Sequence, residues 1–173
     1  ANIPFDYVSP KGGFVPLDPR SMKYTDNSIM AFYETPDFQQ RALTHSLRPD
    51  QVNPADYAAI YFTGGHGVMW DFPNNRELQS ISLAIYQNNG FVTSVCHGIA
   101  GLLNLKDDQG NYLIAGKSIT GFTTMEEVIA GKKRVVPFLN QQVAQKHGAH
   151  FKKKRAYREF AIQDGQLITG QNP

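Results

Sequence analysis

Two apolar segments, separated by a helical pattern, constrain the fold of this chain more than any other feature. The first, YAAIYFTGG (57–65), is a continuous apolar and aromatic run that stops at two glycines. Such a run predicts a strand that is buried on both faces, as in a parallel sheet. The second, FVTSV (91–95), predicts another strand, and it runs directly into Cys96, the only cysteine of the sequence.

The segment between the two strands predicts an amphipathic helix that begins near Pro73 and ends at Asn88-Asn89-Gly90. Its apolar stripe consists of Leu78, Ile81, Leu83 and Ile85. The other predicted elements are strands at 5–10 and 117–120, a Gly/Pro-rich loop at 11–22, helices at 37–47, 98–105, 123–131 and 136–148, and a hairpin at 159–170 that turns at Asp164-Gly165.

Strands that alternate with helices predict an α/β fold with a mostly parallel sheet, helices on both faces and an antiparallel margin. At 173 residues and 41% hydrophobic content, the chain is expected to form one domain over residues 1–173. No apolar run is long enough to cross a bilayer, no secretory signal pattern is found, and a single cysteine excludes an internal disulfide. These features favour a cytoplasmic protein without a membrane partner.

Charge and ligand patterns exclude two further classes of function. The net charge is +2, and the basic clusters at 131–134 and 151–155 are interpreted as solvated surface rather than as a nucleic-acid site. The histidines lack the spacing of a metal motif. We therefore expect neither nucleic acid nor a metal or other cofactor.

Two strand ends carry residues with chemical potential, and such ends meet at one edge of a parallel sheet. In TGGHG (63–67), Gly64 and Gly65 allow a tight turn whose N–H groups can hold an oxyanion, while His66 either lines the same pocket or is exposed. In VCHG (95–98), a cysteine on a strand-to-helix turn is placed as a nucleophile. The alternative for Cys96 is a buried core residue at the end of a strand.

A carboxylate that orients His97 would complete a thiol site. Glu126 and Glu127 both lie early in the predicted helix 123–131, which Thr123 or Thr124 is expected to cap. Either glutamate is also favoured there simply by the helix dipole. Spacing alone does not choose between the two.

Five segments together resemble the ThiJ/PfpI family of the class I glutamine amidotransferase-like superfamily. They are DYVSPKGGFVPLDP, AIYFTGGHGVMWDFP, SVCHGIAGLLN, GKSITGF with a following glutamate, and DGQLITGQNP, in the order of the family. The motifs GGHG and CHG are most similar to those of the branch of stress chaperones and glutathione-independent glyoxalases. The resemblance implies a flavodoxin-like three-layer sandwich, a homodimer and a cysteine on a nucleophile elbow.

For the site, the resemblance implies a triad of Cys96, His97 and Glu127, with the N–H groups of Gly65 and His97 as the oxyanion hole. The implied reaction converts a small 2-oxoaldehyde, such as methylglyoxal, into a hydroxy acid without glutathione. Alternative activities on this scaffold are a peptidase- or amidase-like hydrolase and a deglycase. The non-enzymatic alternatives are a holding chaperone and a thiol redox sensor.

The sequence departs from the family pattern at both ends. In the family, a first strand precedes the SPKGG segment and ends in a glutamate that hydrogen-bonds the cysteine thiol, whereas this sequence begins just before that segment. The family also continues into a final helix beyond GQNP, where this sequence stops. We therefore expect the domain to lack the family's first strand and last helix, with the missing glutamate belonging to a longer or separate chain; the alternative is a degenerate member of the family.

Overall fold

The computed structural model describes residues 3–172 of the chain. The chain divides into two compact units, Ala1–Val52 and Asn53–Pro173, and each is considered by itself. No helix within residues 3–172 is long and apolar enough to cross a membrane. Because the two units are described separately, the expectation of a single domain stays a prediction.

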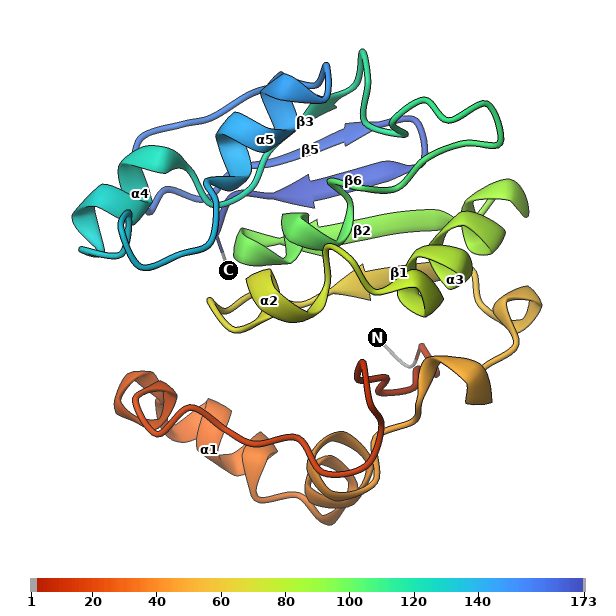
Figure 1. Cartoon of the computed structure of the whole chain (residues 1–173). Helices are drawn as coiled ribbons and strands as arrows, with labels where there is room; N and C mark the ends of the chain where they lie inside the picture. The colour runs from red at the N-terminus through yellow and green to blue at the C-terminus, as the bar shows by residue number, and fades with distance from the viewer. Residues whose placement is uncertain (1–2, 173) are drawn as a thin grey trace. The chain divides into compact units, whose positions relative to one another are not determined.

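A four-stranded sheet organises the larger unit, 53–173 (Figure 1). Its strands, in spatial order, are β1 (Ala59–Phe62), β2 (Phe91–Val95), β6 (Leu167–Gly170) and β5 (Ala161–Asp164). The first three run parallel, and β5 pairs with β6 antiparallel. The α/β fold with a mostly parallel sheet and an antiparallel margin is confirmed, and so is the hairpin, whose register pairs Asp164 with Leu167.

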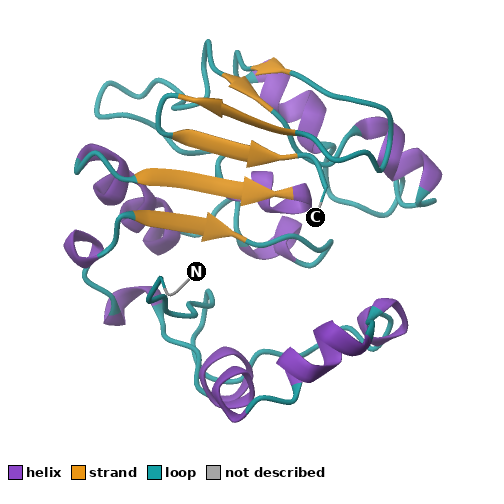
Figure 2. Cartoon of the chain, turned by 180° about the vertical axis from the view of Figure 1, so that it is seen from behind, coloured by secondary structure: helices purple, strands orange, loops and turns teal. Residues whose placement is uncertain are grey.

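The helices of this unit lie against one side of the sheet (Figures 1 and 2). On that side Phe62 is 3% exposed and Val92 and Leu167 are buried, whereas Tyr61 on the opposite side is 59% exposed. The prediction that β1 is buried on both faces was therefore wrong for the unit 53–173. The apolar run is shared between two faces of a strand, and only one of those faces packs against helices.

The helix between β1 and β2 is α3 (Arg76–Gln87), and its apolar stripe packs as predicted. Its start differs from the prediction, because Asn75 is the N-cap and accepts a hydrogen bond from the Leu78 N–H at 2.9 Å. Pro73 therefore precedes the helix instead of forming its first turn. The helix ends before Asn89, which adopts a left-handed conformation with φ of 61°.

The elements after β2 hold the core together. They are the 3₁₀ helix η5 (Cys96–Gly101), β3 (Ser118–Ile119), α4 (Thr124–Ile129), α5 (Asn140–Lys146) and β4 (His150–Phe151), while α2 (Val68–Asp71) precedes α3. The predicted helix 98–105 is thus a shorter 3₁₀ helix that already begins at Cys96. Strand β4, which pairs in parallel with β3, and helix α2 were not predicted. Ile99, Leu102 and Leu103 are fully buried members of the hydrophobic core.

The smaller unit, 1–52, contains η1 (Ser21–Tyr24), α1 (Asn27–Tyr33), the π-helix η2 (Phe38–Thr44) and η3 (Pro49–Gln51). The predicted strand 5–10 is wrong, since Val8 forms only an isolated bridge with Leu47. The predicted helix 37–47 is present but shorter. After this helix the chain turns back, and Ser46 forms an isolated antiparallel β-bridge with Gly13.

Candidate active site

Cys96 occupies a sharp turn between β2 and η5. Val95 is extended, with φ of −134°, while Cys96 itself is left-handed, with φ of 58°. A non-glycine residue in this region is strained, and such strain is typical of a nucleophile elbow. The turn is also crowded, because a Cβ on Gly98 would lie 2.2 Å from the Phe62 carbonyl oxygen. The predicted elbow is therefore confirmed as a structural feature.

The thiol of Cys96 is buried, with the residue only 9% exposed. Burial raises its pKa to about 11, and the negative charges of Glu126 and Glu127 act in the same direction. Hydrogen bonds from the backbone N–H groups of His97 and Gly65 to the sulfur act in the opposite direction. The resting thiol is therefore protonated at neutral pH, and it needs a base to become a nucleophile.

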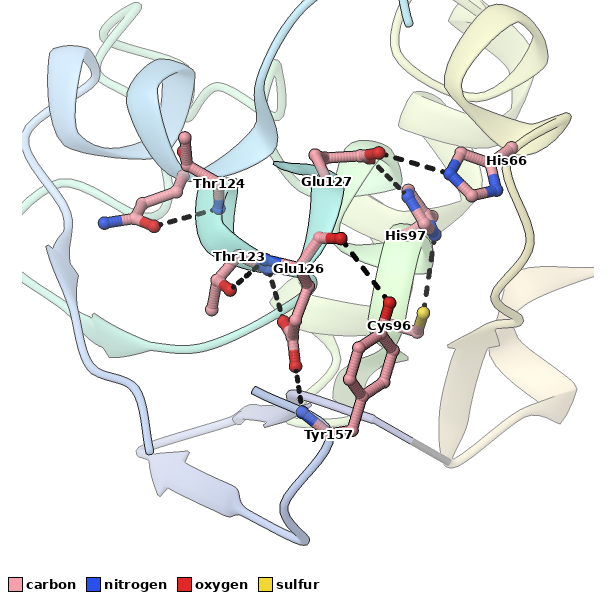
Figure 3. A network of polar contacts seen from close by, with 9 residues as sticks. His66, Cys96, His97, Thr123, Thr124, Glu126, Glu127 and Tyr157 are labelled. Carbon is pink, nitrogen blue, oxygen red and sulfur yellow. Dashed lines mark hydrogen bonds and ion pairs between the residues drawn. The ribbon is translucent and has the colours of Figure 1, made fainter. Parts of the chain in front are cut away.

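His97 offers that base. Its Nδ1 lies 3.4 Å from the Cys96 Sγ, and its Nε2 lies 2.6 Å from Oε1 of Glu127 (Figure 3). The ring contacts both Phe122 and His66, with centroid distances of 4.1 and 4.0 Å. An Nε2–H that donates to the carboxylate leaves the Nδ1 lone pair directed at the thiol.

Helix α4 separates the two candidate glutamates. Its N-cap is Thr123, whose hydroxyl accepts from the Glu126 N–H while the Glu126 carboxylate accepts from the Thr123 N–H, a capping box. Consecutive helical residues point about 100° apart. Glu127 is consequently directed at His97, and Glu126 at a different part of the chain (Figure 3).

Glu126 ties α4 to the end of the described chain. Its Oε1 accepts hydrogen bonds from the Tyr157 N–H at 2.8 Å, the Gln171 amide at 2.9 Å and the Asn172 amide at 2.8 Å. Burial alone would raise the pKa of Glu126, but these donors outweigh it and hold the pKa below its ordinary value. Glu126 is thus a buried anion that organises structure around the site.

His66 gives Glu127 a second imidazole neighbour. Its Nε2 lies 3.2 Å from Oε2 of Glu127, and its side chain is 36% exposed. Burial and the proximity of His97 lower the pKa of His66, while the hydrogen bond to Glu127 acts against them. For Glu127, burial raises the pKa, but the hydrogen bonds from His97 and His66 lower it overall. One carboxylate therefore bridges two imidazoles.

The glycine loop lies directly beside the thiol. A Cβ on Gly64 would lie 3.0 Å from the Cβ of Cys96, so a side chain there would crowd the sulfur. Gly65 has φ of 103°, which L-residues rarely adopt, and this conformation directs its N–H to the sulfur. Gly64, Gly65, His66, Cys96 and His97 follow the ends of β1 and β2, and α4 brings Glu127 to them.

Sequence reasoning missed three residues that contribute to the site. Phe122 supports one face of the His97 ring, and its N–H donates to the Cys96 carbonyl oxygen at 3.0 Å. Gln171 and Asn172 hold Glu126. The available signals were an aromatic residue directly before a helix cap and two amide residues directly after a buried strand.

The comparison with known proteins adds three relatives. A protein of Saccharomyces cerevisiae, "Glutathione-independent glyoxalase HSP31", is 40% identical over 139 residues, which are 77% of this chain and 59% of that protein. The crystal structure of glyoxalase III from Candida albicans has a TM-score of 0.86 at 30% identity, covering 96% of this chain and 73% of that one. The X-ray structure of Rapid Encystment Protein 24 KDa of Francisella tularensis has a TM-score of 0.94 at 38% identity. The match covers 99% of this chain and 76% of that one.

The length of these matches differs between relatives. The chain spans less than two thirds of two curated glyoxalases, those of Candida albicans and Saccharomyces cerevisiae, covering 58% and 59% of their lengths. No family model matches the chain.

Proposed function

Because the chain belongs to the family of glutathione-independent glyoxalases, we propose that it converts a small 2-oxoaldehyde such as methylglyoxal into a 2-hydroxy acid. The observation that carries the proposal is the hydrogen-bonded series Cys96 Sγ, His97 and Glu127, with the N–H groups of Gly65 and His97 at the sulfur. Nothing in this set requires glutathione, because the chain supplies its own thiol.

The first step activates the thiol. Nδ1 of His97 takes the proton of Cys96, and Glu127 stabilises the imidazolium that forms, since its carboxylate lies 2.6 Å from Nε2. The thiolate adds to the aldehyde carbon and gives a hemithioacetal. Its oxyanion is stabilised by the N–H groups of Gly65 and His97, which already point at the sulfur in the resting site.

The later steps move protons and consume water. A base removes the proton from the former aldehyde carbon, the enediol is reprotonated at the neighbouring carbon, and the product is a thioester of the hydroxy acid. Water then cleaves the thioester and regenerates the thiol, with His97 as the proton carrier. The oxidation of one carbon balances the reduction of the other, so methylglyoxal and water give lactate without an external oxidant.

The remaining site residues line the substrate pocket in this proposal. Gly64 leaves the space beside the sulfur that a side chain would fill. His66, which is half-buried on the same loop, faces the reacting groups across Glu127. A small substrate suits a site whose nucleophile is 9% exposed.

The test is consumption of methylglyoxal by the purified protein without glutathione, with lactate measured as the product. We expect turnover that Cys96→Ser abolishes. Absence of turnover in protein with a verified free thiol would refute the glyoxalase proposal. Cleavage of a peptide library in the same preparation would instead favour a hydrolase, which uses the same thiolate and oxyanion hole.

Assembly and location follow the family resemblance and are predictions. We propose that two copies of the chain form a homodimer in the cytoplasm. Light scattering of the purified protein at several concentrations measures the assembly, and a strictly monomeric mass would contradict it. A holding-chaperone activity, if present, is expected to survive Cys96→Ser because it needs apolar surface rather than the thiol.

A further inference from the structure

The two imidazoles around Glu127 form a donor set that the thiol mechanism does not fully use. A ring nitrogen of His66, a ring nitrogen of His97 and a carboxylate oxygen of Glu127 lie within 4.8 Å of one another, and within residues 3–172 this is the one His/Cys/Asp/Glu cluster of that kind. Both imidazoles direct the same nitrogen at one carboxylate (Figure 3). We propose that these three side chains bind Zn²⁺ or a similar divalent transition metal ion, and that the bound ion inhibits the thiol site.

The donor types and their spacing fit such an ion. Zinc takes imidazole nitrogens and carboxylate oxygens at about 2.0–2.2 Å, so neighbouring ligand atoms in a tetrahedral site lie about 3.4 Å apart. The His66–Glu127 pair is already at 3.2 Å, and the His97–Glu127 pair at 2.6 Å has to open by less than about 1 Å. His66 can supply the remaining movement, because it is half-exposed and flanked by Gly65 and Gly67.

The surroundings also resemble a metal site with an open position. His97 and Glu127 are both buried, which fixes two ligands before the ion arrives. The exposed part of the His66 side chain gives the ion a route from solvent. Three protein ligands leave the fourth coordination position for a water molecule, as in zinc sites that keep one position open to solvent or substrate.

Metal binding would remove the base that Cys96 needs. The ion takes the Nε2 lone pair of His97, so the ring proton moves from Nε2 to Nδ1 without net uptake or release of a proton. Nδ1 then carries a hydrogen that faces Sγ at 3.4 Å, and it can no longer accept the thiol proton. Because Sγ and Glu127 lie at opposite nitrogens of one imidazole, the ion does not require the thiol as a ligand.

The binding experiment uses Zn²⁺ itself as the probe. The purified protein competes for Zn²⁺ with a chromophoric chelator, and the melting temperature is recorded with and without the metal. We expect one Zn²⁺ per chain in the wild type and in Cys96→Ala, with a raised melting temperature. His66→Gln should weaken binding at least about 10-fold, while His45→Gln, an exposed histidine outside the cluster, should bind like the wild type.

Each other outcome overturns the proposal. Binding that is lost in Cys96→Ala but kept in His66→Gln would assign the metal to the thiol, and equal binding in all variants would assign it to unrelated surface donors. Melting of metal-free His66→Gln at the wild-type temperature checks that the variant is folded.

Zinc binding can be tested whether or not the protein is a glyoxalase, whereas inhibition rests on the proposed glyoxalase activity. We expect added Zn²⁺ to stop methylglyoxal turnover reversibly, with recovery on adding a chelator. Zinc that binds without inhibiting would refute the inhibitory role.

Discussion

Alkylation of Cys96 should accelerate about tenfold for each pH unit between pH 7 and pH 10. The reason is the raised pKa of about 11, which burial of the thiol causes in the first place. The thiolate is the reactive form, so at pH 7 roughly one molecule in 10⁴ carries the nucleophile. Raising the pH to 9 should therefore increase the rate about 100-fold.

The assay is simple because the sequence contains a single cysteine. Mass spectrometry follows the addition of iodoacetamide at a series of pH values, and every modified chain reports Cys96. Limited access to a buried sulfur lowers all the rates by a similar factor and leaves the pH dependence unchanged. Urea-unfolded protein is the control, because its thiol has the ordinary pKa near 9.0 and its rate should level off about two pH units earlier.

A plateau in the folded protein with a midpoint below pH 8 would refute this reasoning. It would mean that the thiol is already ionised at rest, as a thiolate paired with a protonated His97. The proposed order of events, in which His97 first removes the proton from a neutral thiol, would then be wrong. The same curve therefore tests the electrostatics of burial and the first catalytic step.

Three substitutions test the parts of the site separately. Glu127→Gln should lower methylglyoxal turnover by about 10²- to 10⁴-fold, because His97 loses the carboxylate that orients it. The same substitution should speed alkylation of Cys96, because it removes a negative charge that raises the pKa of the thiol. If both rates changed in the same direction, the role assigned to Glu127 would be wrong. Glu126→Ala should lower the free energy of unfolding by about 3–5 kcal/mol, because the donors that converge on this carboxylate lose their acceptor. Denaturant unfolding measures this change. A decrease below about 1 kcal/mol would show that the network is dispensable. Gly98→Ala should destabilise by about 3 kcal/mol or more, since its Cβ would meet the Phe62 carbonyl oxygen at 2.2 Å, and wild-type stability would mean that the elbow is less tight than described.

The sequence predicted those elements whose pattern is local. Strand β2, the apolar stripe of α3 and the β5–β6 hairpin all follow from residue spacing and turn residues, and they form as expected. Strand β1 shows the limit, because an apolar run does not record which of its faces another layer covers. Tyr61 is exposed although it belongs to the same run as the buried Phe62.

The choice between Glu126 and Glu127 could not be made from spacing for a related reason. Two consecutive helical residues differ by about 100° in direction, so the orientation of α4 against the sheet decides which one meets His97. Hydrogen bonds from Tyr157, Gln171 and Asn172 to the Glu126 carboxylate hold α4 in that orientation, and they leave Glu127 facing His97. Family resemblance selected Glu127, and the geometry now gives a physical reason for the selection.

The same geometry also weighs the rival view of Cys96 as a redox sensor. Sensor cysteines combine a low pKa with solvent access, because oxidants react with the thiolate. Cys96 has neither property, since its pKa is raised to about 11 and the residue is 9% exposed. His97 beside the sulfur can still remove its proton, because Nδ1 lies 3.4 Å from Sγ. The burial and the raised pKa therefore favour a nucleophile that depends on a neighbouring base over a sensor.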